Sequence, residues 1–426
     1  MRTRLRYGLR IGVVGVLAAS LLAACGGSSG PPTLTWYINP DNGAQAKLAK
    51  TCSAQSHGAY RITTNILPND ASQQRQQLVT RLAAKDASID LMSLDPVFVA
   101  EFAEAGFLAD VPAQYRESFT KDIVKPAVEA STWKGKLIAA PFWANTQLLW
   151  YRKSLAKSAG LDMSKPVTWQ QVIDAAHKLR KTVGVQADVY EGYTVWINAL
   201  IAGAGGKIVE NPGAIAKDLK LGVNTAAGKD AANVIRQVAR QGVGGPSLST
   251  NEESQSLALF EKPATAAFLV NWPYTWAQMA ADKVPYRDRD VGWTFYPETV
   301  AGKPSRPPFG GIEIGVGKFT AHKKEAFDAV NCIRSAEHQL EYMIQSGNPS
   351  ANTTAYSDPR VKKAFPMASL IERSLQRAAP RPQSQYYGDL STALQESFSP
   401  PSSVSASTPK QAQDFILQVV KGEKLL

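Results

Sequence analysis

Histidine and cysteine are scarce in this sequence. Its 426 residues include 4 His and 3 Cys, and the histidines show no spacing typical of metal ligands. Lysine and arginine are in excess, giving a formal net charge of +11, but they form no block of five or six. The sequence therefore gives no support to a metal site and little support to nucleic-acid binding.

The sequence also lacks the complete motifs of several enzyme classes. The stretch at residues 203–206 has no final glycine of a dinucleotide-binding loop, and residues 317–318 lack the flanking residues of a phosphate-binding loop. The serine-hydrolase pattern at residues 26–30 has no predicted strand before it or helix after it. We therefore predict that the chain is not an enzyme and needs no cofactor. One alternative stays open, because two carboxylates such as Asp95 and Glu253 could hydrolyse a glycoside.

The N-terminal residues predict export. Four arginines among the first ten residues precede an apolar segment at residues 11–24, which is too short to span a bilayer as a mature helix. The segment ends in Leu22-Ala23-Ala24-Cys25, which resembles a bacterial lipobox and implies a signal peptide at residues 1–24 and a lipid on Cys25. Residues 25–32 are rich in glycine, serine and proline, which predicts a flexible tether. The alternative is an ordinary secretory signal with a chance cysteine.

The rest of the chain, about 390 residues, exceeds the usual size of one compact core, so we expect two lobes. Residues 34–38, 60–66 and 89–94 read as extended and residues 44–52 and 72–84 as helical, an alternation that predicts a parallel α/β sheet. Ligands in such sheets bind beyond the carboxyl ends of the strands. The polar residues that follow predicted strands should therefore face the binding edge: Asn39, Asp41, Asn42 and Asp95.

The two cysteines that remain after Cys25 are Cys52 and Cys332. An even pair outside the cytoplasm favours a disulfide. Cys52 closes the first predicted helix and Cys332 lies in another at residues 323–334, so a disulfide would require the chain to leave the first lobe and return to it. The alternative is two unpaired cysteines buried separately.

Four blocks of the sequence carry a family resemblance: Trp133-Lys134-Gly135-Lys136, Asn145-Thr146-Gln147-Leu148, Pro166-Val167-Thr168-Trp169 and Phe309-Gly310-Gly311-Ile312. Their order and spacing resemble the extracellular solute-binding proteins of sugar ABC importers, including the maltose-binding type. The resemblance implies an α/β fold with two lobes of the periplasmic-binding-protein type, hinge crossings between them, and a ligand cleft. Thr168 is also a good N-cap for the helix that the third block opens.

The resemblance further implies how the chain is divided and where it works. It places the first lobe at residues 33–142, the second lobe at 143–275, a return to the first lobe at about 276–345, and the second lobe with hinge-side C-terminal helices at 346–426. It implies a monomer that is held by its lipid on the outer face of the cytoplasmic membrane. Its partners would be a carbohydrate ligand and the permease subunits of an ABC transporter.

A narrower resemblance concerns the mycobacterial trehalose-binding members of the family, to which residues 101–106, 145–151, 270–273 and 356–359 and the pair Arg381-Pro382 are similar. It implies a di- or oligosaccharide ligand, with trehalose or a related glucoside favoured. The alternatives are another solute, such as a different sugar or a glycerophosphodiester, and an extracytoplasmic glycoside hydrolase or lyase.

A sugar pocket needs carboxylates, amides and guanidinium groups for hydroxyls, and aromatic rings for the apolar sugar faces. The resemblance implies six main ligand-binding residues: Asp95, Asn145, Glu253, Trp272, Gly311 and Arg381. Asp95 and Glu253 would accept hydrogen bonds from hydroxyls, and Arg381 would donate as a fork. Asn145 would do both, Trp272 would stack or donate, and Gly311 would let the backbone approach the ligand. The weaker candidates are Asn42, Gln74, Glu191, Tyr193, Trp143 and Trp276.

Four of the main residues also have a purely structural interpretation. Trp272 could pack in the core, and Asp95 could cap the helix that begins near Val97. Glu253 could stand at an exposed helix start, where acidic residues are favoured by the helix dipole. Arg381 could lie in a surface loop.

Overall fold

The computed structural model describes residues 30–426. The predicted signal peptide and the predicted lipidation site Cys25 lie outside the described residues. Within the described part, no helix is both long enough and apolar enough to cross a membrane.

The first lobe is built on a five-stranded sheet with the order β2-β1-β3-β11-β6. The strands are β1 (Thr33–Ile38), β2 (Arg61–Ile66), β3 (Leu91–Leu94), β6 (Ala140–Thr146) and β11 (Phe309–Val316). β1 runs parallel to β2 and β3, as the alternation of strands and helices predicts. β11 runs antiparallel to both β3 and β6, so the sheet is mixed rather than wholly parallel. The sheet is mixed because β11 enters it from the second lobe and so runs in the direction opposite to β3.

Helices cover this sheet on both faces. They are α1 (Ala44–Gln55), α2 (Ala71–Ala83), α3 (Val99–Glu104), α4 (Ala113–Thr120), α5 (Lys125–Ala130), α13 (Lys323–Ile333) and α14 (Ala336–Ser346). A short 3₁₀ turn at Pro96–Phe98 leads from β3 to α3, and β4 (Thr132–Trp133) and β5 (Lys136–Leu137) form a small hairpin before β6.

The second lobe is built on a four-stranded sheet with the order β10-β7-β9-β8. Its strands are β7 (Leu148–Arg152), β8 (Thr182–Gly184), β9 (Ala266–Asn271) and β10 (Val291–Thr294). Its helices are α6 (Lys153–Ala159), α7 (Trp169–Leu179), α8 (Glu191–Gly203), α9 (Ala226–Arg240), α10 (Glu253–Phe260), α11 (Tyr274–Ala281), α12 (Arg287–Asp290), α17 (Tyr387–Phe398) and α18 (Thr408–Val420). The predicted cap of α7 is present, because the Thr168 hydroxyl accepts from the Gln171 backbone N–H in a capping box.

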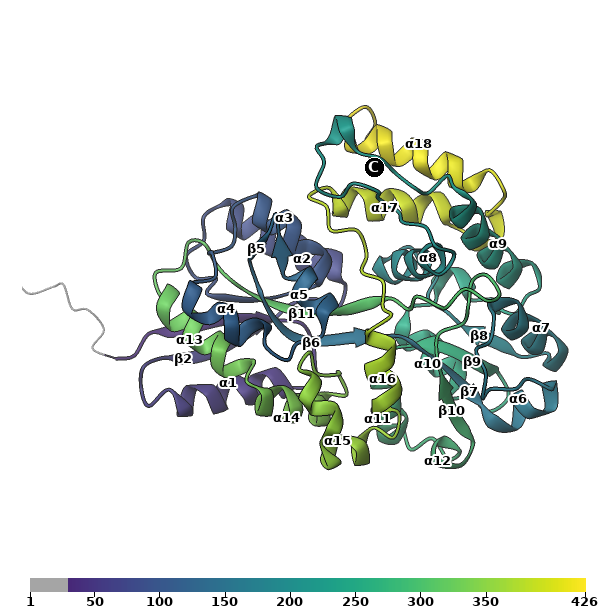
Figure 1. Ribbon diagram of the computed structural model, residues 1–426, viewed down its shortest axis with the longest axis horizontal. Helices are drawn as coiled ribbons and strands as arrows, with labels where there is room; N and C mark the ends of the chain where they lie inside the picture. Colours follow the sequence, from purple (N-terminus) through teal and green to yellow (C-terminus); the bar gives the residue numbers. More distant parts are fainter. Residues whose placement is uncertain (1–29) are drawn as a thin grey trace, which may run out of the picture. The chain divides into compact units, whose positions relative to one another are not determined.

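The chain passes between the lobes at three places (Figure 1). It leaves the first sheet through β6 and enters the second sheet at β7, with only Gln147 between the two strands. It returns through β11. Because β10 still pairs with β7, this return begins at Phe309, later than the predicted boundary at residue 276. The third passage leads from α14 through α15 (Pro359–Ala364) and α16 (Ala368–Leu375) to α17, which packs on α8.

The disulfide is confirmed. Cys52 on α1 and Cys332 on α13 are bonded, and their Cα atoms lie 5.9 Å apart across 280 residues of sequence. α1 also packs against α14. The bridge therefore fixes the returning segment to the first helix of the first lobe, as the cysteine count favours.

Candidate functional site

A buried arginine joins the two lobes. Arg381 is 3% exposed and lies on the segment that leads into α17. Its Nη2 donates to Asp95 Oδ1 at 2.7 Å, and its Nη1 donates to Glu191 Oε1. Asp95 follows β3 of the first lobe and Glu191 is the first residue of α8 in the second lobe. A single guanidinium thus bridges a carboxylate from each lobe.

Glu191 is held by α17 as well. The Tyr387 hydroxyl donates to Glu191 Oε1, and the Ser391 hydroxyl donates to Oε2 at 2.8 Å. Burial raises the pKa of Glu191, against the attraction of Arg381. Burial also acts against the charge of Arg381, but the nearby carboxylates outweigh it and raise the pKa of Arg381. The arginine therefore stays charged, and its Nε has no hydrogen-bond partner in the described part of the chain.

A second cluster forms where β9 ends. Trp272 directly follows β9 and is partly exposed, and its indole Nε1 donates to Glu253 Oε1 at 3.4 Å. Asn271 donates from Nδ2 to the Glu253 carbonyl at 2.9 Å. Burial raises the pKa of Glu253, while its hydrogen bonds oppose the rise. The cluster combines an aromatic ring with a carboxylate that is partly removed from water. Such a carboxylate needs hydrogen-bond donors to replace the water that it has lost.

Strand β11 connects the two clusters. The Trp272 ring lies over Gly310, where an added Cβ would stand 3.1 Å from the ring carbon Cη2. β11 pairs with β3 at Glu313 and Leu94, so one further step of the register sets Ile312 opposite Asp95. Gly310 and Ile312 are two residues apart, or about 7 Å along a strand. The two clusters therefore lie close together along one strand.

The predicted residue Gly311 lies on this part of β11, and the predicted residue Asn145 lies beside it on β6. Asn145 is 6% exposed, stands opposite Gly310 on β6, and accepts from the Thr146 backbone N–H at 3.0 Å. Gly311 has φ +139°, and an added Cβ would collide with the Trp143 carbonyl. Only glycine fits this position without strain, because both its backbone conformation and the approach of β6 exclude a side chain.

The comparisons with known proteins agree with this architecture. The family described as bacterial extracellular solute-binding protein matches residues 41–340. This chain is a bacterial extracellular solute-binding protein. It is 26% identical over 372 residues to a probable ABC transporter-binding protein of Deinococcus radiodurans, covering 84% of each chain. It is 29% identical over 170 residues to a mannitol-binding protein of Pseudomonas aeruginosa, covering 39% of this chain and 38% of that protein.

The fold of this solute-binding protein also matches solved structures. Maltose-bound MalE3 of T. maritima superposes with a TM-score of 0.80 over 92% of this chain and 100% of that chain, at 22% sequence identity. The predicted fold, α/β with two lobes of the periplasmic-binding-protein type, is confirmed.

Of the four structural interpretations, the structure supports the one for Asp95 and differs from those for Glu253, Arg381 and Trp272. Asp95 does cap the 3₁₀ turn, since its Oδ1 accepts from the Val97 backbone N–H at 3.3 Å, and it binds Arg381 as well. Glu253 begins α10 but is partly buried rather than exposed. Arg381 is buried rather than in a surface loop, and Trp272 is partly exposed rather than packed in the core.

The weaker candidates other than Glu191 and Trp143 lie elsewhere or in the core. Gln74 donates to the Pro68 carbonyl at 2.7 Å, and Asn42 is exposed before α1. Tyr193 is fully buried among apolar residues of the second lobe. Trp276 packs edge-on against Trp293 with the ring centroids 5.3 Å apart. The described contacts do not join these residues to Arg381 or Trp272. Trp143 is different, because it flanks Gly311 and has a buried Nε1 without a partner among the described residues.

Sequence reasoning missed Tyr387 and Ser391. Both lie on α17, about 200 positions after Glu191, and no local motif marks them. It also missed Tyr190, whose pKa is raised by burial and by the charge of Glu253. A tyrosine directly before the N-terminus of a buried helix was the one available signal.

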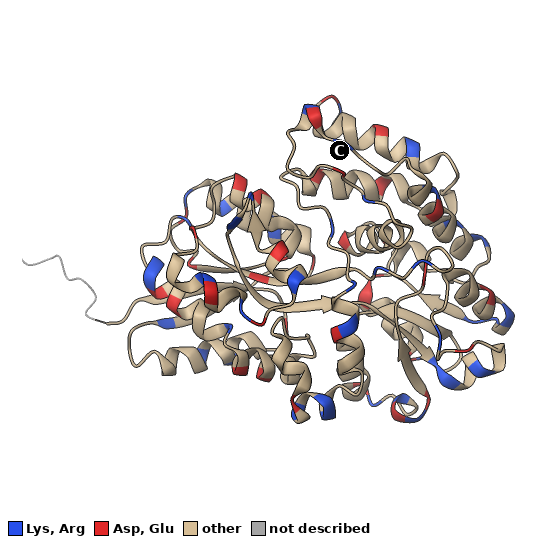
Figure 2. Ribbon diagram, viewed as in Figure 1, with Lys and Arg blue, Asp and Glu red and all other residues tan. Residues whose placement is uncertain are grey.

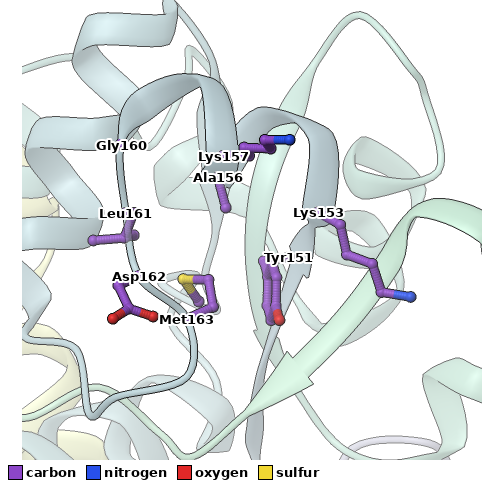
Figure 3. A pocket seen from close by; sticks show the side chains of 8 residues that line it. All are labelled: Tyr151, Lys153, Ala156, Lys157, Gly160, Leu161, Asp162 and Met163. Carbon is purple, nitrogen blue, oxygen red and sulfur yellow. The ribbon is translucent and has the colours of Figure 1, made fainter.

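Other features of the described residues are separate from this site. A hollow of about 390 Å³ in the second lobe is lined by Tyr151 and residues of α6 and the loop after it, and by none of the predicted ligand-binding residues (Figure 3). Cys52, Cys332 and His338 place ligand atoms within 4.8 Å of one another. Both sulfurs are bonded to each other, however, so this cluster does not offer a thiolate pair to a metal. Charged residues of both signs are spread over both lobes in the view of Figure 2.

Proposed function

We propose that this solute-binding protein captures a di- or oligosaccharide, with trehalose or a related glucoside favoured, and delivers it to the permease of an ABC transporter. The observation that carries the proposal is the gathering of polar and aromatic groups from both lobes along β11. Asp95 comes from the first lobe, and Glu253 and Trp272 come from the second. A structural neighbour supports the ligand class, because it holds the disaccharide maltose.

The chemistry of these groups suits a sugar. Each hydroxyl both donates and accepts, so the hydroxyls of a sugar match a site that offers carboxylates and an amide. Asp95 and Glu253 would accept from hydroxyls, and Asn145 would donate and accept. Trp272 offers one face of its ring to the apolar side of a pyranose. Gly311 lets the backbone of β11 approach the ligand.

Capture would work by closure rather than by catalysis. A ligand that contacts both lobes binds the closed arrangement more tightly than the open one. It stabilises the closed arrangement by the difference between these two binding free energies. The Arg381 bridge between Asp95 and Glu191 ties the third passage to both lobes, so movement of the lobes and occupation of the site would be linked. The sugar would leave chemically unchanged.

The N-terminal residues complete the proposal. A lipid on Cys25 and a short tether would keep a monomeric receptor close to its permease on the outer face of the cytoplasmic membrane, which raises the effective concentration of each for the other. Cys25→Ser is expected to move the protein from the membrane fraction to the soluble fraction. Retention of that variant in the membrane would contradict lipid anchoring at this cysteine.

A sugar alcohol is the second candidate ligand, because the match to a mannitol-binding protein favours it. Calorimetric titration with trehalose, maltose and mannitol separates the two. We expect Trp272→Ala to weaken saccharide binding at least tenfold, because the sugar loses the aromatic ring on which it stacks. Trp133→Ala is the matched control, since Trp133 is also partly exposed but lies in the β4–β5 hairpin. Equal effects of the two substitutions would contradict the proposed site.

A further inference from the structure

A groove of about 380 Å³ lies outside the proposed sugar site. It runs between the loop before α7, the end of β10 and the helix α16. The lining residues that matter for its chemistry are Lys165, Trp293, Phe295, Met367, Arg373 and Arg377. We call it the arginine groove. Its lining contains three cationic side chains and no carboxylate.

Two arginines share one aromatic ring in the arginine groove. The Cζ atoms of Arg373 and Arg377 lie 5.2 Å and 4.5 Å from the centroid of the Phe295 ring. Such stacking orients a guanidinium while leaving most of its N–H donors free for a partner. Arg373 Nε donates to the Ser369 carbonyl at 3.3 Å. The ion pairs formed within residues 30–426 include neither arginine.

Within the described residues, no ion pair therefore compensates the charges of the two arginines. Lys165 has an acidic neighbour in Asp162 at 3.5 Å, but both side chains are more than half exposed, so this pair contributes little. Oriented arginine forks bind carboxylates in a bidentate manner, and the nearby Trp293 and Phe295 offer apolar surface. The complementary partner carries carboxylates next to an apolar side chain.

The position of the groove connects it to the hinge. α16 packs against β6, the strand that leads from the first lobe to the second (Figure 1). Arg377 is followed closely by Ala379, which bridges to Pro308 at the start of the returning strand. Arg381, two residues further on, holds Asp95 and Glu191. The segment from Arg377 to Arg381 therefore joins the two places. Arg377 lines the arginine groove, and Arg381 contacts Asp95 at the proposed sugar site.

We propose that the arginine groove docks an acidic segment of a partner protein. Carboxylates of that segment bind Arg373 and Arg377, and an adjoining apolar side chain packs against Trp293 and Phe295. This surface is separate from sugar capture and does not depend on which sugar is bound. A partner at this place contacts the hinge segment itself.

The test uses the full chain and a fluorescein-labelled pentapeptide of four glutamates around a central tryptophan, with its four-glutamine counterpart as the neutral probe. Fluorescence anisotropy gives the affinity of each. We expect the acidic peptide to bind at least tenfold more tightly than the neutral one at low salt. Arg373→Gln with Arg377→Gln should weaken its binding at least tenfold. Lys362→Gln with Lys363→Gln removes the same charge from exposed positions of α15 and should change the affinity less than twofold.

Several results would overturn the proposal. The acidic peptide could fail to bind, could bind no better than the neutral peptide, or could lose affinity equally in both double variants. Binding of phosphatidylglycerol vesicles that depends on the two arginines, without binding of the peptide, would instead assign the groove to a lipid surface. Trehalose calorimetry on the Arg373→Gln, Arg377→Gln variant should stay within twofold of the parent, which keeps this test separate from that of the sugar site.

Discussion

Glu313 provides a sharp test of the packing around the returning strand. It lies on β11, is 0% exposed, and accepts a hydrogen bond on Oε2 from the Ser131 hydroxyl. Its Oε1 has no partner among the described residues. Burial raises the pKa of Glu313 to about 8, and the opposing effects of Ser131 and Arg334 do not cancel it. We therefore expect this carboxyl to be protonated in the folded protein at neutral pH.

The size of the effect follows from linkage. In the unfolded chain Glu313 has its ordinary pKa of about 4.5, so between pH 4.5 and pH 8 the folded protein holds a proton that the unfolded chain has released. The neutral Glu313 carboxyl therefore makes its full contribution to the free energy of unfolding below about pH 4.5. That contribution is lost as the pH rises to about 8. The slope is about 1.4 kcal/mol per pH unit, or about 5 kcal/mol over the window.

Glu313→Gln removes this titration. The free energy of unfolding, measured by urea denaturation from pH 5 to pH 9, should fall more steeply for the parent than for the variant, and the variant should be the more stable one at pH 9. Glu117→Gln changes an exposed glutamate of α4 and is the control, which should follow the parent. Parallel pH profiles for the parent and Glu313→Gln would show that Glu313 does not bind a proton on folding.

The other predictions concern the disulfide and the site. Cys52→Ser with Cys332→Ser opens a loop that spans 280 positions and should lower the free energy of unfolding in urea by about 5 kcal/mol, because the unfolded chain gains conformational entropy. An unchanged midpoint would show that the disulfide does not stabilise the fold in this way. Arg381→Gln leaves two carboxylates without their cation and should destabilise the fold by about 3–5 kcal/mol in the same assay; a loss below 1 kcal/mol would show that the bridge is dispensable. Asn145→Ala should weaken trehalose binding by about tenfold in calorimetry, and unchanged affinity would remove it from the site.

The local elements of the first lobe could be predicted from the sequence. The alternation of extended and helical stretches predicts β1, β2 and β3, and the short apolar run that ends at Leu94 marks β3 most clearly. In the second lobe, the capping residue Thr168 marks the start of α7. These signals depend on neighbouring residues. The pairing of Cys52 with Cys332 was favoured for a different reason, since only two cysteines remained in an exported chain. The prediction that the chain returns to the first lobe followed from it.

Long-range pairings could not be predicted in the same way. Nothing in the residues of β10 indicates that they pair with β7, and so the predicted return of the chain was placed too early. Glu191 was only a weak candidate because its partners Arg381 and Tyr387 come about 190 residues later. The pairing of a buried charge with its counter-charge depends on the folded chain, so the spacing of residues in the sequence does not predict it.

We propose that the groups along β11 bind a sugar without changing it. The most direct measurement is calorimetric titration of the full chain with trehalose, followed by analysis of the recovered sugar. We expect saturable heat at one trehalose per chain and unchanged trehalose afterwards. An absence of heat with trehalose and with every other saccharide, or cleavage of the recovered sugar, would contradict it.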